Sequence, residues 1–327
     1  MKKILSIFIC LILAFTMTAC GGTAPDTSNA SNTSNNTNGD ASASNTSDTI
    51  SDGQNDSVEI SDTPENDSGI AEDTTVIGFS PVTAVDNDQC SITITDIDAE
   101  NMWGYTLKAT LENKSSDITY MFSVYSASIN GVTCDPFFAS EVAPGKKSIE
   151  EISFSTETLE ENGITDFTDI ELTFRVSDYD DWSAAPVADE TVHVYPYGED
   201  KATVFVRDAQ ATDTVLADNE YATIIVTGYY TDDIWGYTAD LYIVNKTDTE
   251  IMISVEDVSV NGFMADPFFA TSVMPHKSTF TSISWSEDIF IECGITTVEN
   301  IEFILAASDY NDWMADRFFE EAITLNP

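Results

Sequence analysis

The residues WGYTLKATLENK, at positions 103–114, decide the fold of this chain. Aromatic and apolar residues occupy every second position from Trp103 to Leu111, and glycine or polar residues fill the positions between them. A period of two is typical of a β-strand with one buried face. The stretch therefore predicts a strand whose odd-numbered side chains, Trp103 included, face a core.

The same stretch recurs as WGYTADLYIVNK at positions 235–246. Three further motifs recur with it: NG at 130–131 and 261–262, DPFFA at 135–139 and 266–270, and SDYDDW at 177–182 as SDYNDW at 308–313. The offset is 132 residues up to the Asn-Lys turn and 131 after it. Each copy has about 110–125 residues, the size of one small domain, so the pattern indicates a tandem pair and not a short-period solenoid.

Each copy contains further short apolar runs separated by turn signals. The Asn-Gly pair at 130–131 is a strong hairpin signal. Short helices are expected between Ser155 and Gly163 and between Ser286 and Gly294, each with a capping serine and a terminating glycine. The remaining predicted strands are 91–97, 121–129, 149–154, 170–176 and 190–194 in the first copy, and 223–229, 235–243, 280–285, 301–306 and 321–325 in the second. Roughly seven short strands per copy predict an all-β chain with two tandem immunoglobulin-like antiparallel β-sandwiches.

The first residues predict export. Lys2 and Lys3 precede an apolar run, residues 4–17, which as a helix would rise about 21 Å, short of the roughly 30 Å needed to span a bilayer. Met17-Thr18-Ala19-Cys20-Gly21 resembles the lipobox of bacterial lipoproteins. That resemblance implies a signal peptide at 1–19 and a lipidated Cys20, modified by palmitate-type chains, as the mature N-terminus. Ordinary secretion with an incidental cysteine is the alternative.

Residues 20–75 are rich in Ser, Thr, Asn, Asp and Gly. Eleven acidic residues and no Lys or Arg lie between positions 21 and 75. Such a segment buries too little apolar surface to offset its backbone entropy. We therefore expect a disordered acidic tether that lifts the folded part away from the membrane.

The net charge limits the partners. The chain carries a formal charge of −45, and residues 76–327 hold 46 acidic and ten cationic side chains. A surface this acidic repels nucleic-acid phosphates and anionic lipid headgroups, so no nucleic-acid partner is expected. A hydrophobic content of 42% still allows a substantial core.

The turn motifs carry a family resemblance. The Asn-Lys turn at 113–114, the Asn-Gly hairpin, the Pro-Gly turn at 144–145 and the strand 149–154 that follows it resemble the immunoglobulin-like domains of unknown function in Firmicutes-type surface lipoproteins. The resemblance covers residues from about 85 to 327. It implies a β-sandwich repeat at 76–197, a second at 198–327, and no catalytic residues.

The cysteines and histidines give little support for enzymatic chemistry. Cys90 and Cys134 both become alanine in the second copy, which fits either a disulfide between them or two independently buried thiols. Cys293 has no evident partner. His193 and His276 are not repeated between the copies, so neither belongs to a shared site.

Acidic turns at the ends of two predicted strands form the one candidate metal site. Closely spaced oxygen ligands suit Ca²⁺, although no complete calcium-loop motif is present. A solvated turn is the alternative interpretation, and no other cofactor is expected. The candidate ligands are Asp178, Asp180, Asp181, Asp309, Asn311 and Asp312.

Trp182 and Trp313 follow these acidic turns. An exposed tryptophan beside carboxylates can stack on a sugar ring or anchor a protein partner, whereas a buried one belongs to the core. The sequence thus favours a non-enzymatic binding or display protein, lipid-anchored on the extracellular face of a bacterial membrane, whose partner is an extracellular protein or a glycan. The alternatives are a spacer lipoprotein without a ligand and a carbohydrate-binding module.

Overall fold

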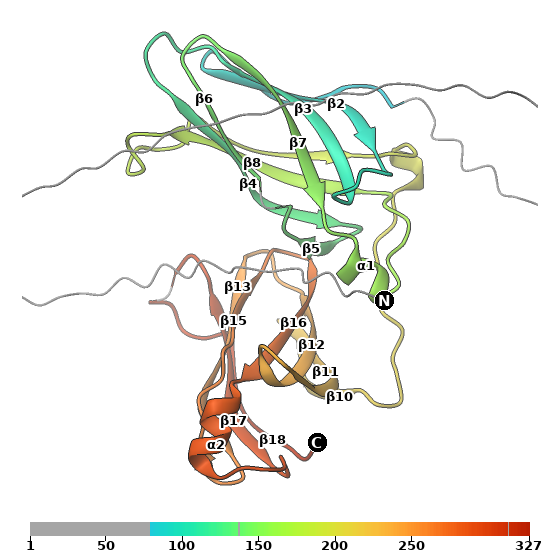
Figure 1. Ribbon diagram of the computed structural model, residues 1–327, viewed down its shortest axis with the longest axis vertical. Coiled ribbons are helices and arrows are strands. Elements are labelled where there is room, and N and C mark those ends of the chain that lie inside the picture. The colour runs from blue at the N-terminus through green and yellow to red at the C-terminus, as the bar shows by residue number, and fades with distance from the viewer. Residues whose placement is uncertain (1–78, 137, 313) are drawn as a thin grey trace, which may run out of the picture. The chain divides into compact units, whose positions relative to one another are not determined.

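The computed structural model describes residues 79–327 apart from 137 and 313. The predicted signal peptide, Cys20 and the tether lie outside the described residues. The described part belongs to one compact unit, Ile70–Pro327, and consists of eighteen strands, two short α-helices and one 3-10 turn (Figure 1). No helix in this part is long and apolar enough to cross a membrane. The described part of the chain is therefore of the all-β class, as its sequence predicted.

In the first repeat the strands form two antiparallel layers. One layer has the order β1-β2-β3-β7, and in the other β4 pairs with β5, β6 and β8, and β8 pairs with β9. The strands are β1 (Val82–Asp86), β2 (Cys90–Asp98), β3 (Tyr105–Asn113), β4 (Tyr120–Ile129), β5 (Val132–Cys134), β6 (Ala139–Val142), β7 (Lys147–Phe154), β8 (Ile170–Asp178) and β9 (Ala188–Val194). Their facing sides share one apolar core.

The second repeat has the same strand order. Its layers are β10-β11-β12-β16, and β13 paired with β14, β15 and β17, with β18 beside β17. The strands are β10 (Thr214–Asp218), β11 (Ala222–Asp232), β12 (Gly236–Asn245), β13 (Ile251–Val260), β14 (Phe263–Met264), β15 (Ala270–Val273), β16 (Ser278–Trp285), β17 (Ile301–Asp309) and β18 (Phe319–Leu325). A second apolar core lies between these layers.

The pairing confirms the immunoglobulin-like sandwich class. The third strand of each repeat pairs with the second and the seventh, and the fourth pairs with the eighth, so the chain crosses between layers as in a Greek key. Short edge strands such as β1 and β10 were not predicted, because four or five residues at a sheet edge carry a weak alternating pattern.

The WGYT motif is a turn followed by a strand, which corrects one expectation. Trp103 precedes β3 and is 69% exposed, whereas Tyr105 is buried. Gly104 has φ +105°, and a Cβ placed there would lie 2.1 Å from the Phe154 carbonyl oxygen. Gly236 meets the Trp285 carbonyl oxygen in the same way. The motif is repeated because glycine alone allows the chain to pass this close to the end of β7 or β16.

The Asn-Lys motif fixes the crossing from β3 to β4. Asn113 is buried, and its Nδ2 donates to the carbonyl oxygens of Ile118 and Val142, both at 2.8 Å. Asn245 makes the equivalent bonds to Thr249 and Val273. The motif therefore satisfies buried backbone carbonyls, which explains its repetition without any role in binding.

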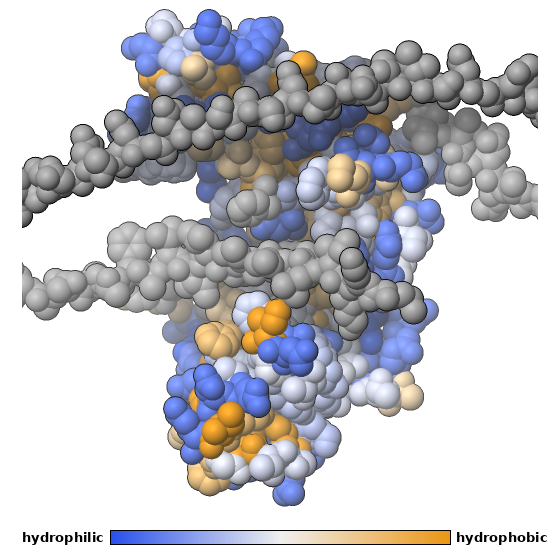
Figure 2. All heavy atoms as spheres, viewed as in Figure 1, coloured by the Kyte–Doolittle hydropathy of each residue, from blue (hydrophilic) through white to orange (hydrophobic). Residues whose placement is uncertain are grey.

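The two predicted helices form between β7 and β8 and between β16 and β17. Helix α2 (Glu287–Cys293) ends at Gly294 with φ 68°, as expected, and begins after Ser286, whose side chain makes no capping hydrogen bond. Helix α1 (Glu157–Glu161) begins after Thr156, one residue later than predicted from Ser155. Around these elements the visible surface mixes hydrophilic side chains with small hydrophobic patches (Figure 2).

Candidate functional site

The loop between β8 and β9, which we call the first tip, presents an exposed aromatic pair. It covers residues 179–187. Trp182 is 68% exposed, and its ring lies 6.4 Å from that of Tyr179 at an angle of 56°. The Tyr179 N–H donates to the Thr119 carbonyl oxygen at 3.0 Å, which holds the tip beside the turn that precedes β4. The structure thus places Trp182 where a ligand can reach it.

The carboxylates of the first tip are engaged by their own loop. Asp178 Oδ1 accepts the Asp180 N–H at 2.9 Å, and Asp181 Oδ1 accepts the Ser183 hydroxyl at 2.6 Å and its N–H at 3.0 Å. The hydrogen bond from the Ser183 hydroxyl lowers the pKa of Asp181, with further help from backbone N–H groups. These carboxylates build the turn that carries Trp182.

The second tip, residues 310–318 between β17 and β18, repeats this local structure. Asp309 accepts the Asn311 N–H at 2.8 Å, and Asp312 accepts the Met314 N–H at 3.1 Å. Trp313 lies outside the described residues. Across residues 79–327 other than 137 and 313, no three His, Cys, Asp or Glu side chains are grouped to hold a metal ion. The acidic residues proposed for Ca²⁺ are thus distributed over two turns that they stabilise themselves.

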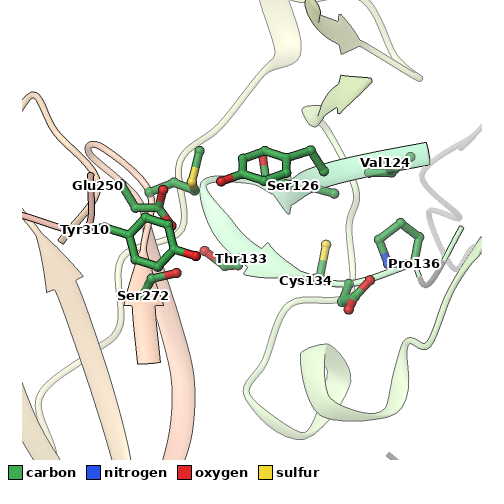
Figure 3. Close-up of a pocket in the computed structure, with 12 residues that line it drawn as sticks. Val124, Ser126, Thr133, Cys134, Pro136, Glu250, Ser272 and Tyr310 are labelled. Carbon is green, nitrogen blue, oxygen red and sulfur yellow. The ribbon is translucent and has the colours of Figure 1, made fainter. Parts of the chain in front are cut away.

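A pocket of about 280 Å³ lies where the second tip meets the first repeat (Figure 3). We call it the junction pocket. Tyr310, Glu250 and Ser272 line it from the second repeat, and β4 and β5 supply the opposite wall. The residues contributed by the first repeat are Val124, Tyr125, Ser126, Ala127, Thr133, Cys134, Asp135 and Pro136, and Met274 completes the second repeat's side. Sequence reasoning missed this pocket because it is formed by residues more than a hundred positions apart.

The aromatic and acidic groups of the pocket interact electrostatically. Burial raises the pKa of Tyr125, and the neighbouring Glu250 carboxylate raises it further. The Arg175 guanidinium lies 3.7 Å from the centre of the Tyr125 ring, while it also pairs with Asp189 at 2.8 Å. The pocket is therefore lined by apolar side chains together with hydroxyl and carboxylate groups, and the Arg175 cation beside it is already paired.

Cys90 and Cys134 are free thiols, so the candidate disulfide between them is not formed. Gln89, beside Cys90, accepts a hydrogen bond from Tyr120 at the start of β4, whereas Cys134 pairs with Ala127 near its end. Seven residues of strand separate these positions by roughly 20 Å, too far for a disulfide. In the second repeat Ala222 and Ala265 are fully buried, as Cys90 is, whereas Cys134 is half-buried, so both positions hold small side chains packed on a core.

The Cys134 thiol is a poorly activated nucleophile. Desolvation strongly raises the pKa of the Cys134 thiol, which disfavours the reactive thiolate. His193 contacts Asp169 at 2.7 Å and Glu171 at 3.3 Å, and His276 contacts Asp248 at 2.8 Å. Each histidine is thus held by carboxylates, and neither lines the junction pocket.

No protein-family model and no curated protein matches this chain. A chaperone–tip adhesion subunit pre-assembly complex of Csu pili from Acinetobacter baumannii matches at 10% identity over 67% of this chain and 90% of that chain, with a TM-score of 0.21. Red sea bream transglutaminase matches at 11% identity, covering 74% and 31% of the two chains, with a TM-score of 0.20. A Porphyromonas gingivalis W83 protein of unknown function matches at 12% identity, covering 68% and 91%, with a TM-score of 0.19. Similarity at this level carries no argument about activity or partners.

Proposed function

We propose that this chain is a non-enzymatic binding protein, lipid-anchored through Cys20 on the extracellular face of a bacterial membrane, and that its first tip holds the ligand. The observation that supports the proposal is the 68% exposure of Trp182 on a turn fixed by Asp178 and Asp181. A large aromatic side chain held in solvent by a rigid turn is a ready contact for a partner.

The chemistry of the first tip favours a neutral glycan. An aromatic face stacks on the apolar side of a sugar ring, and nearby carboxylates accept its hydroxyl groups. Residues 178–184 contain three aspartates and no cation, which disfavours an anionic ligand. A protein partner that presents neutral or cationic groups is the second candidate, because exposed tryptophan is also a frequent anchor in protein interfaces.

The test compares two tryptophans of equal exposure. Cells that display the full chain are probed with a glycan array and with labelled extracellular proteins from culture. We expect Trp182→Ala to abolish binding and Trp103→Ala to leave it unchanged. Trp103 is also exposed, at 69%, but it precedes the start of β3, whereas the first tip lies beside the turn that follows the end of β3. Equal binding by both variants would refute the role of Trp182. Failure of wild-type cells to bind any probe would favour the spacer alternative.

A further inference from the structure

The two repeats meet edge to edge. The outer edge of β16 pairs in parallel with β5, through Ser278 and Val132, and the Ser278 N–H donates to the Gly131 carbonyl oxygen at 3.0 Å. This bridge joins strands of both repeats into one sheet with the order β10-β11-β12-β16-β5-β4-β8-β9. We call this contact the inner junction.

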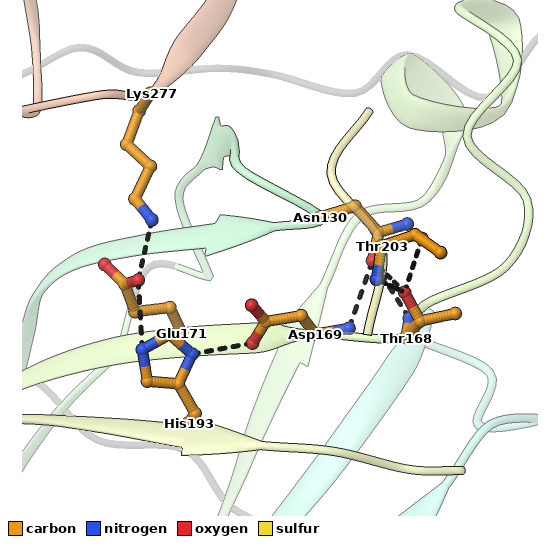
Figure 4. A network of polar contacts seen from close by, with 7 residues as sticks. All are labelled: Asn130, Thr168, Asp169, Glu171, His193, Thr203 and Lys277. Carbon is orange, nitrogen blue, oxygen red and sulfur yellow. Dashed lines mark hydrogen bonds and ion pairs between the residues drawn. The ribbon is translucent and has the colours of Figure 1, made fainter. Parts of the chain in front are cut away.

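Polar and apolar contacts reinforce the inner junction. Lys277 Nζ lies 2.6 Å from Glu171 Oε2, and the two side chains are only 18% and 22% exposed (Figure 4). Glu171 also contacts His193. Beside this pair, Phe280 packs against Tyr242 with ring centres 4.9 Å apart, and it adjoins the core of the first repeat. One ion pair and the packing of Phe280 against the core of the first repeat therefore flank the backbone bridge.

The first repeat carries the counterpart of the β16 edge on β7, and none of the described strands pairs with that outer edge. At the offset of 131, Lys277 corresponds to Lys146, Ser278 to Lys147 and Phe280 to Ile149. Ile149 is 79% exposed on β7, the edge strand of its sheet. Of the ten cationic side chains in the described part of the chain, Lys146 is the one without an ion pair.

The second repeat carries the counterpart of the β5 edge. Gly131 corresponds to Gly262, Val132 to Phe263 and Glu171 to Glu302. Phe263 is 52% exposed, and its neighbour Met264 is 64% exposed. Glu302 is exposed and, within the described residues, is not part of any ion pair. An apolar strand edge and an unpaired carboxylate thus stand where the inner junction has Val132 and Glu171.

We infer that a second copy of this chain docks on these surfaces, with the β7 edge of one copy against the β14 edge of the next. The pairing would repeat the inner junction: Lys147 opposite Phe263, Lys146 paired with Glu302, and Ile149 in the place of Phe280. An exposed apolar strand edge is a template for a further strand, and the charges on the two edges are complementary. This inference does not depend on what the first tip binds.

The geometry determines the kind of assembly. The β7 edge and the β14 edge differ, so a docked pair still has one free β7 edge and one free β14 edge. Further copies therefore add head to tail. The contact between copies is weaker than the inner junction, because the inner junction has the linker residue Phe205 packed on Phe280 at 6.0 Å and a covalent connection that raises the effective concentration. Crowding of copies on one surface favours the contact.

The test uses two differently tagged full chains in the same cells, one with Lys147→Cys and the other with Phe263→Cys. Paired strand positions bring Cα atoms within disulfide range, so we expect a mixed-tag dimer that reduction abolishes. Lys201→Cys with Phe263→Cys is the matched control, because Lys201 is an exposed lysine in the 3-10 turn Glu199–Lys201, outside β7 and β14. Absence of the mixed dimer, or an equal yield in the control, would overturn the inference.

Charge reversal tests the ion pair within the same assay. Adding Lys146→Glu to the Lys147→Cys chain should reduce the mixed dimer at least several-fold. Adding Glu302→Lys to the Phe263→Cys chain should then restore it. Lys201→Glu makes the same change in net charge and should have no effect. Equal losses with Lys146→Glu and Lys201→Glu, or no restoration by Glu302→Lys, would exclude the proposed pairing.

Discussion

The two tips have the same local structure and different surroundings. Tyr179 and Tyr310 follow equivalent strands. The N–H of Tyr179 donates to the Thr119 carbonyl oxygen and that of Tyr310 to the equivalent oxygen of Glu250, both at 3.0 Å. Trp182 of the first tip is 68% exposed, and Tyr310 of the second tip lines the junction pocket beside the first repeat. The same motif therefore carries an exposed tryptophan in one repeat and supplies part of a pocket wall in the other. The local sequence determines the conformation of the turn, and the neighbouring repeat determines what the turn contacts.

The cores offer the strongest way to test whether the repeats are equivalent. Phe154 and Trp285 occupy the same position, and both are fully buried. We expect Trp285→Ala and Phe154→Ala each to lower the free energy of unfolding by about 3–5 kcal/mol, because each leaves a large cavity. The Trp285 Nε1 donates to the Ala265 carbonyl oxygen at 2.9 Å, a bond that phenylalanine cannot make. Trp285 should therefore show the greater loss in chemical denaturation.

The buried asparagines test whether the repeated motif is structural in both copies. Asn113→Ala and Asn245→Ala each remove a donor from at least two carbonyl oxygens, so we expect losses of about 2–3 kcal/mol in the free energy of unfolding. Asn162→Ala, which removes one exposed bond to Thr158, is the control and should cost less than about 0.5 kcal/mol. A loss confined to one repeat would show that the motif serves different purposes in the two copies.

The sequence predicted the features that depend on local chemistry. The alternating pattern predicted strands such as β3 and β17, and the glycine after Cys293 predicted the end of α2. The tandem repeat predicted two equivalent cores. Trp103 was one exception, because a period of two does not show where a turn ends and a strand begins. Its glycine neighbour, with a positive φ, is the local signal for that boundary.

The contacts between repeats could not be predicted, since they join residues that no local pattern relates. Glu171 and Lys277 are 106 positions apart, and nothing in either neighbourhood marks them as partners. The junction pocket depends on the same arrangement. A signal was nevertheless present in the repeat itself, because residues that differ between two otherwise similar copies, such as Phe280 and Ile149, lie at the surface where the copies meet different neighbours.

The linker between the repeats contains an ion pair that makes the stability of the fold sensitive to acid. Arg207 donates from Nη1 and Nη2 to the two carboxylate oxygens of Asp213, at 2.7 and 2.8 Å, and these bonds lower the pKa of Asp213. A lowered pKa stabilises the fold above the ordinary value near 4, and this contribution is lost as the pH falls through the lowered value. We expect Arg207→Gln to cost about 1–2 kcal/mol at neutral pH and little at pH 2. A loss independent of pH would mean that Arg207 acts by packing alone.

The smallest predicted change in stability distinguishes the edge of β16, which pairs with β5, from the equivalent edge of β7. Lys277→Met breaks the half-buried pair with Glu171 and should cost about 1 kcal/mol, whereas Lys146→Met, at the equivalent position, should change the free energy of unfolding by less than about 0.5 kcal/mol in dilute solution. The two free energies of unfolding are compared by chemical denaturation at low protein concentration, because docking between copies is then absent. If both lysines cost the same, Lys146 has a partner within its own repeat and the β7 edge is not free. If neither substitution lowers the free energy of unfolding, the ion pair contributes nothing to the inner junction, and the backbone bridge and the packing of Phe280 hold the repeats together.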